Sequence, residues 1–113
     1  MKTISTTELK NLVDQKTKFT LVNTLKAEDF EKTKIADAVS VPLDTADFAA
    51  RVEKEAGGKA SKVVVYCSSS KCDASEKGAK KLLEAGFTDV SRYTDGVEAW
   101  EKEVGQTTAG ASS

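Results

Sequence analysis

The chain has 113 residues, which is enough for one domain with a hydrophobic core of its own. Hydrophobic residues make up 39% and charged residues 31%, as is typical of folded globular proteins, and the net charge of -1 favours neither nucleic acid nor an acidic membrane as a partner. No apolar run approaches the roughly 20 residues of a membrane span, and residues 1–10 lack the apolar core of a signal peptide, so we expect a cytoplasmic protein.

Helical and strand-like spacings of apolar residues alternate along the chain. Residues 5–8 are typical of a capped helix start, and amphipathic helices are predicted at 5–13, 27–33, 45–55, 73–85 and 96–104. Short strands are predicted between them at 19–22, 38–41, 63–66 and 90–93. Pro42 is expected to end the second strand. Gly57 and Gly58 are expected to end the helix at 45–55, and Gly86 the helix at 73–85.

The stretch Val63–Tyr66 is a continuous run rich in β-branched residues, which is typical of a strand covered on both faces. The helix after it is expected to bury one apolar side, formed by Ala79, Leu82 and Leu83. Strands that alternate with helices indicate an α/β fold with a mostly parallel central sheet flanked by helices on both faces. We expect one domain over 1–105, followed by a disordered tail over 106–113.

A short polar segment joins the strand Val63–Tyr66 to the next helix and contains both cysteines of the chain, Cys67 and Cys72. Loops at the carboxyl ends of parallel strands are where open α/β sheets bind ligands. Small serines let the backbone turn its N–H groups inward, and the start of the following helix adds partial positive charge, which lowers a thiol pKa. Cys67 is therefore the candidate nucleophile. The candidate substrate-binding loop consists of Ser68, Ser69, Ser70, Lys71 and Cys72.

Each of these residues also has an ordinary structural interpretation. Cys67 can pack as a small buried thiol at a strand end, and Cys72 can pack beneath the loop. In the functional interpretation, Cys72 is a resolving thiol that forms a disulfide with an oxidised Cys67. Lys71 is either a solvated charge or a substrate contact. Because the chain has no histidine, its two cysteines cannot complete a zinc site, and no metal or other cofactor is expected.

Several motifs together resemble a single-domain rhodanese. They are LVN at 21–23, IADAVSVP at 35–42, VVVYC at 63–67, GFTDV at 86–90 and DGVEAW at 95–100. The likeness implies a sheet sandwiched by helices and a sulfur-transfer activity. In this family the loop cysteine, which corresponds to Cys67, takes a sulfane sulfur from thiosulfate, a persulfide or polysulfide. It then passes that sulfur to cyanide or another thiol, while the backbone of 68–72 cradles the persulfide.

The sequence departs from the family's common pattern in the loop and upstream of it. The common loop carries a glycine and ends in arginine, whereas this one ends in Ser70, Lys71 and Cys72. The family's usual aspartate, arginine and histidine around the first short helix are replaced here by Asn23, Leu25 and Lys34. Without the anion-binding arginine, thiosulfate is an unfavourable donor, because a lysine is a point charge rather than a planar fork.

The expected function is that of a sulfurtransferase or sulfane-sulfur carrier, whose partners are a sulfur donor and a thiol acceptor. Two alternatives stay open: a non-catalytic rhodanese-like binding or regulatory module, and a thiol redox sensor that uses Cys67 and Cys72. A cysteine phosphatase is excluded, because such an enzyme grips phosphoryl oxygens with a loop arginine. The only arginines, Arg51 and Arg92, lie outside the loop in the sequence.

Overall fold

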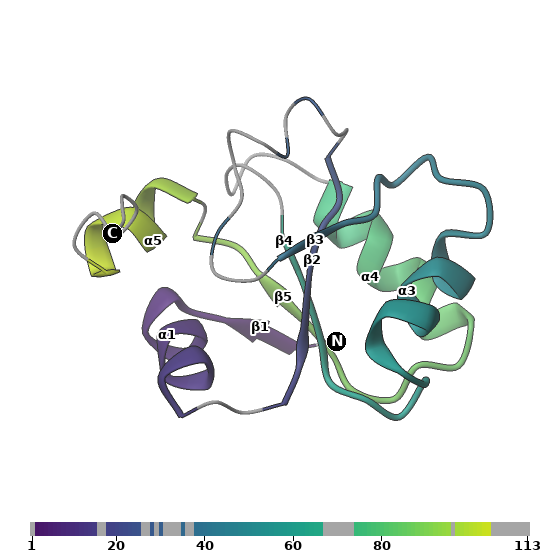
Figure 1. Ribbon diagram of the computed structural model, residues 1–113, viewed down its shortest axis with the longest axis horizontal. Coiled ribbons are helices and arrows are strands. Elements are labelled where there is room, and N and C mark those ends of the chain that lie inside the picture. The colour runs from purple at the N-terminus through teal and green to yellow at the C-terminus, as the bar shows by residue number, and fades with distance from the viewer. Residues whose placement is uncertain are drawn as a thin grey trace.

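The computed structural model has a layered α/β fold (Figure 1) and describes residues 2–15, 18–25, 28, 30, 35, 38–66, 74–95 and 97–104. The strands are β1 (Lys2–Ile4), β2 (Thr20–Asn23), β3 (Val39–Ser40), β4 (Val63–Tyr66) and β5 (Val90–Tyr93). The helices are α1 (Thr6–Asp14), α3 (Phe48–Ala56), α4 (Ala74–Glu84) and α5 (Val97–Val104). The fold class predicted from the sequence is therefore confirmed.

The strands form one sheet in the order β1-β5-β4-β2-β3, and every neighbouring pair runs parallel. β4 lies in the middle, where Val64 is paired with Leu21 of β2 and Val65 with Arg92 of β5. Because the strands are parallel, their carboxyl ends meet at one edge of the sheet. That edge is where residues following different strands can be brought together.

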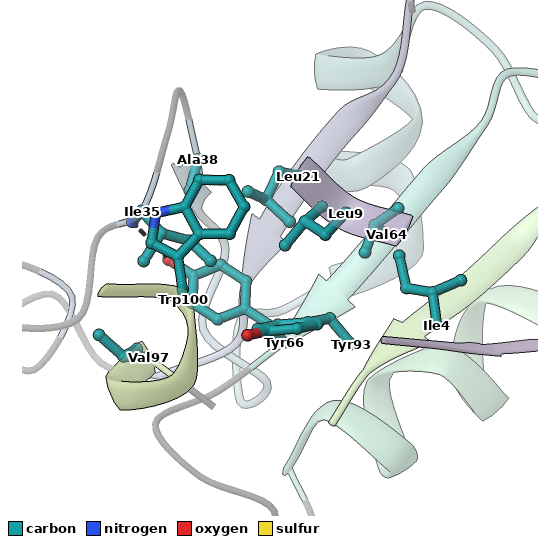
Figure 2. Close-up of a cluster of buried hydrophobic side chains, with 10 residues drawn as sticks. All are labelled: Ile4, Leu9, Leu21, Ile35, Ala38, Val64, Tyr66, Tyr93, Val97 and Trp100. Atoms are coloured by element: carbon teal, nitrogen blue, oxygen red, sulfur yellow. Dashed lines mark hydrogen bonds between the residues drawn. The ribbon is translucent and has the colours of Figure 1, made fainter. Parts of the chain in front are cut away.

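Alternate residues of β4 belong to two hydrophobic clusters, one on each face of the sheet. Val64 and Tyr66 pack in the cluster under α1 and α5, and Val63 and Val65 in the cluster under α3 and α4 (Figures 1 and 2). The first cluster contains Ile4, Leu9, Leu21, Ile35, Ala38, Val64, Tyr66, Tyr93, Val97 and Trp100. The second contains Val22, Val41, Phe48, Val52, Val63, Val65, Ala79, Leu82, Phe87 and Val90. Helices thus cover both faces, as predicted.

Local signals in the sequence set several helix ends. Ser5 Oγ accepts a hydrogen bond from Glu8 N at 3.2 Å, while Glu8 Oε1 accepts one from Ser5 N at 3.1 Å, so the predicted cap of the first helix is confirmed. Gly57 and Gly86 adopt the left-handed conformation with φ of 86° and 106°, and they end α3 and the turn after α4.

The structure differs from the sequence-based expectations at three points. The pattern does not predict β1, which has only three residues and is held by its pairing with β5. The helix expected from residue 45 begins at Phe48, directly after Asp47 in the left-handed conformation with φ of 56°. Leu83 was expected to be buried but is 37% exposed, because α4 turns Ser75, Gly78, Ala79 and Leu82 toward the sheet. Most of the predicted helix 27–33 lies outside the described residues, although Phe30 packs against the first cluster.

Candidate functional site

The carboxyl edge of the sheet has a switch point between its two central strands. From β4 the chain continues to β5 on one side, whereas from β2 it continues to β3 on the other side. The helix after β4 packs on the face of the second cluster, whereas Phe30, which follows β2, packs against the first cluster. Connections that leave neighbouring strands in opposite directions open a crevice, which is the usual ligand site of such sheets.

The candidate site residues predicted from the sequence follow β4 at this switch point. They are Cys67, Ser68, Ser69, Ser70, Lys71 and Cys72, and all of them lie outside the described residues, as do Lys34 and Asp73. The structure does describe both flanks of this segment. Tyr66 is the residue before Cys67, and Ala74 opens α4. The structure therefore gives the geometry of the strand end before this segment and of the helix start after it.

The end of β4 is fixed to the residue after β2. Thr24 donates two hydrogen bonds to the carbonyl oxygen of Tyr66, from its backbone N at 3.1 Å and from its Oγ1 at 3.3 Å. Both residues are buried, with 2% of Thr24 and none of Tyr66 exposed. The peptide that leads into Cys67 thus starts from a carbonyl group with two donors. The sequence analysis did not identify this role of Thr24, although a hydroxyl residue directly after a buried strand could have indicated it.

The Tyr66 hydroxyl group belongs to a buried polar network, of which Figure 2 shows the hydrogen bond with Ile35. It accepts hydrogen bonds from Asn23 Nδ2 at 3.1 Å and from Ile35 N at 3.2 Å. Asn23 Oδ1 in turn accepts a hydrogen bond from Leu25 N at 2.8 Å. Burial raises the pKa of Tyr66 to about 12, against the effect of the two hydrogen bonds. The phenol is therefore neutral near pH 7, and its role is to hold the segments after β2 and before β3 in place.

The start of α4 lies close to the sheet and to β5. A Cβ atom on Gly78 would lie 3.1 Å from both Thr24 Cγ2 and Phe48 Cζ, so only a glycine fits here without displacement of its neighbours. One turn earlier, Ser75 is 2% exposed, and its Oγ accepts a hydrogen bond from Arg92 Nε at 3.1 Å. Arg92 lies outside the loop in the sequence, but the fold brings its side chain to the first turn of the helix after the loop. The sequence signal for this placement was the alternation of side chains along β5, which puts Arg92 on the same face of the sheet as Val90.

On the other side of β4, the end of β5 is joined to the start of α1. Asp95 Oδ2 accepts hydrogen bonds from both Thr6 N and Thr6 Oγ1 at 2.9 Å. The Tyr93 hydroxyl group lies 2.8 Å from Thr6 Oγ1. The contact with Asp95 satisfies the first N–H group of α1, and together these hydrogen bonds hold the carboxyl end of β5 against α1.

A surface pocket of about 630 Å³ adjoins the switch point. Thr24, Leu25 and Leu43 line it from the segments after β2 and β3, and Lys77 and Lys81 line it from α4. Its volume falls in the range of about 300–1,000 Å³ that is common for small-molecule sites. Since Thr24 also donates hydrogen bonds to the Tyr66 carbonyl group, it belongs both to the pocket lining and to the contacts at the end of β4. Among the described helices, none is long and apolar enough to cross a membrane.

Comparisons with known proteins agree with this geometry. The family model described as a rhodanese-like domain matches residues 5–103. Within the set of curated proteins that was searched, nothing matched the chain.

Solved structures with the same fold include a protein from Bacillus halodurans, with a TM-score of 0.79 and 24% identity over 92% of this chain and 74% of that chain. The rhodanese-like domain of an Anabaena protein gives a TM-score of 0.75 and 22% identity over 98% of this chain and 87% of that one. A thiosulfate sulfurtransferase from Pseudomonas aeruginosa gives 0.80 and 23% over 95% of this chain, which spans only 20% of that longer protein. At these identities the likeness establishes the fold.

Proposed function

Because this chain belongs to the rhodanese-like domain family, we propose that it is a sulfurtransferase or sulfane-sulfur carrier that forms a persulfide on Cys67. The observation that carries the proposal is the position of Cys67 in the chain. It is the residue directly after Tyr66, the last residue of the central strand β4, at the switch point of a parallel sheet. A cysteine there, followed by a helix start, is favourably sited to act as an anionic sulfur nucleophile.

The proposed reaction is two successive displacements at sulfur. The Cys67 thiolate attacks the sulfane sulfur of a donor, forming a new S–S bond while the bond within the donor breaks. The donor leaves with the electron pair, as a thiolate from a persulfide or as sulfite from thiosulfate. A thiol acceptor, as its thiolate, or cyanide then attacks the outer sulfur, and Cys67 leaves as a thiolate. No net oxidation occurs and no cofactor is needed, and the backbone of 68–72 serves to stabilise the negative charge on sulfur.

The polar network beside β4 suits an organic persulfide donor better than a dianion such as thiosulfate. Asn23 is neutral, fully buried and engaged with Tyr66 and Leu25, so it holds the segment after β2 without adding charge. Leu25 stands where the family's common pattern has a charged residue. A dianion such as thiosulfate therefore lacks a guanidinium from this segment. We expect an organic persulfide, which carries a single negative charge at its sulfane sulfur, to load Cys67 more efficiently than thiosulfate.

The deciding experiment measures sulfur loading directly. The reduced protein is incubated separately with an organic persulfide, with polysulfide and with thiosulfate, and intact and peptide mass spectrometry then locates any added sulfur. We expect one sulfur on Cys67, removable by cyanide or a small thiol, with the organic persulfide as a better donor than thiosulfate. Cys67→Ser is expected to take up none, because a serine hydroxyl cannot carry persulfide sulfur.

Cys72→Ser is the matched control, because it removes the other thiol of the same segment. It is expected to load sulfur in a single turnover and to differ from the parent only in its recovery after peroxide. Loading of Cys67→Ser at the parent level would refute the assignment of Cys67. A parent protein that takes no sulfur from any of these donors, with Cys67 still reactive, would indicate a binding or regulatory module. A Cys67–Cys72 disulfide in place of the adduct would indicate a redox sensor.

A further inference from the structure

The surface pocket of about 630 Å³ lies between α4 and the segments that follow β2 and β3. From α4, Lys77 and Lys81 contribute to its lining. The segment after β2 contributes Thr24 and Leu25, and the segment after β3 contributes Leu43. Three parts of the chain that are far apart in the sequence thus enclose a volume typical of small-molecule sites.

Thr24, which is 2% exposed, holds the parts of this pocket together. Its carbonyl oxygen accepts a hydrogen bond of 3.0 Å from Leu43 N, which joins the segments after β2 and β3. Its Cγ2 methyl group lies 3.1 Å from the place that a Cβ atom on Gly78 would take, so α4 packs directly against it. Pro42 also lines the pocket, and its carbonyl oxygen accepts a hydrogen bond of 2.9 Å from Thr45 N. Because these contacts exist without a ligand, a ligand does not need to order the pocket on binding.

Charges of both signs line this pocket beside apolar side chains. Lys77 and Lys81 lie four positions apart, on one side of α4, whereas Glu28 and Asp44 come from the segments after β2 and β3. Within the described part of the chain, Lys81, Glu28 and Asp44 form no ion pair with a neighbour. Two positive and two negative side chains balance each other, so the lining does not favour an ion that carries one sign of charge only.

The apolar part of the lining consists of Leu25, Pro42 and Leu43. All three are half-buried, so each leaves apolar surface that a ligand can cover. Removal of such surface from water favours a ligand with an apolar side chain of its own.

We propose that this pocket binds a small zwitterion with an apolar side chain, of the chemical class of amino acids and short peptides with free ends. The lysines of α4 attract its carboxylate, and Glu28 and Asp44 attract its ammonium group. The apolar lining contacts its side chain. The binding makes and breaks no covalent bond. The proposal goes beyond the sulfur chemistry and does not involve Cys67.

The test is the binding of leucyl-leucine and of free leucine to the reduced protein, measured by calorimetric titration and by the NMR shifts of backbone amides. No sulfur donor is present, so the result is independent of the sulfur-loading experiment. We expect a Kd of about 1 mM for the dipeptide, with the largest shift changes at Thr24, Leu43 and Lys81. Binding of either compound at these residues supports the proposal. Absence of binding by both up to about 10 mM, or shift changes confined to other parts of the chain, would overturn it.

Blocked dipeptides test the two charged groups of the ligand one at a time. N-acetyl-leucyl-leucine lacks the ammonium group, and leucyl-leucine amide lacks the carboxylate. Asp44→Asn is expected to weaken the binding of leucyl-leucine about fivefold and to leave the binding of the acetylated peptide unchanged. Lys81→Gln is expected to weaken the binding of leucyl-leucine about fivefold and to leave the binding of the amide unchanged. Both side chains are exposed, so neither substitution disturbs the core.

Lys80→Gln is the matched control, because Lys80 precedes Lys81 on α4 but does not line the pocket. Its Nζ lies 3.6 Å from Glu76 Oε2, and its substitution should leave the binding of leucyl-leucine unchanged. Equal losses in Lys80→Gln and Lys81→Gln would refute the proposal, because they would indicate a general attraction to a basic helix. A loss in Asp44→Asn that is as large for the acetylated peptide as for leucyl-leucine would refute it as well.

Discussion

Tyr66→Phe removes one oxygen atom from the buried network at the end of β4 and leaves the aromatic ring in place. The lost hydroxyl group accepts hydrogen bonds from Asn23 Nδ2 and Ile35 N. Both donors are then left without this acceptor in a region where Tyr66 and Asn23 have no solvent exposure. A buried donor without a partner costs about 1–3 kcal/mol, so we expect the free energy of unfolding at pH 7 to fall by about 3 kcal/mol.

The same hydroxyl group makes the difference between parent and variant depend on pH. Burial raises the pKa of Tyr66 to about 12 in the folded state, against its ordinary value of 10.0. Because the folded pKa is raised, the stability that this group contributes is fully present below pH 10 and is lost as the pH rises from 10 toward 12. The loss approaches roughly 3 kcal/mol, of which about 1.4 kcal/mol is expected by pH 11. Phenylalanine does not titrate, so the gap between the two proteins should narrow over this range.

Urea denaturation followed by the fluorescence of Trp100 measures both quantities. The free energies of unfolding of parent and Tyr66→Phe are compared at pH 7, 9, 10 and 11, and their difference removes the contribution of groups that the two proteins share. A cost below about 0.5 kcal/mol at pH 7 would contradict the assignment of two buried hydrogen bonds to this hydroxyl group. A gap that stays constant between pH 9 and 11 would contradict the effect of burial on its titration.

Two further substitutions test the packing around the same edge of the sheet. Gly78→Ala gains about 1 kcal/mol of helix propensity but places a Cβ atom 3.1 Å from Phe48 Cζ, and we expect a net loss of about 1 kcal/mol in thermal denaturation. A stabilised Gly78→Ala would show that α4 can move away from the sheet at little cost. Ser91 is buried, and its Oγ has no hydrogen-bond partner within the part of the chain that the structure describes, so Ser91→Ala should raise stability by up to about 1 kcal/mol. A measurable loss in this variant would reveal a partner for that hydroxyl group.

Much of the fold follows from local patterns in the sequence. The apolar run of β4 is predicted with the bounds that it has in the structure. A strand that is buried on both faces is apolar at successive positions, so its ends can be recognised in the sequence. The start of α1 is predicted because its capping box involves residues only three positions apart. The stop at Gly57 is predicted because a left-handed residue strongly favours glycine. The alternation of strands and helices then implies a parallel sheet with two covered faces.

Sequence also fixes which residue follows the central strand, and hence the prediction that Cys67 is the nucleophile. That prediction and the role of Cys72 depend on residues outside those that the structure describes, so they stay predictions. The resemblance to the rhodanese family carried the expected chemistry, and the match of the family model over residues 5–103 confirms the membership.

Only the tertiary structure decided which distant residues contact the end of β4 and the start of α4. Asn23 looked like a replaced charged residue, but it holds Tyr66, which lies 43 positions away in the chain. Arg92 looked remote from the loop, but the pairing of β5 with β4 brings it to Ser75. Even within α4, the phase of packing against the sheet left Leu83 exposed. Local patterns determine the secondary structure of residues that are close in the sequence. These contacts depend instead on strand order and helix placement, which are set by the packing of the whole domain.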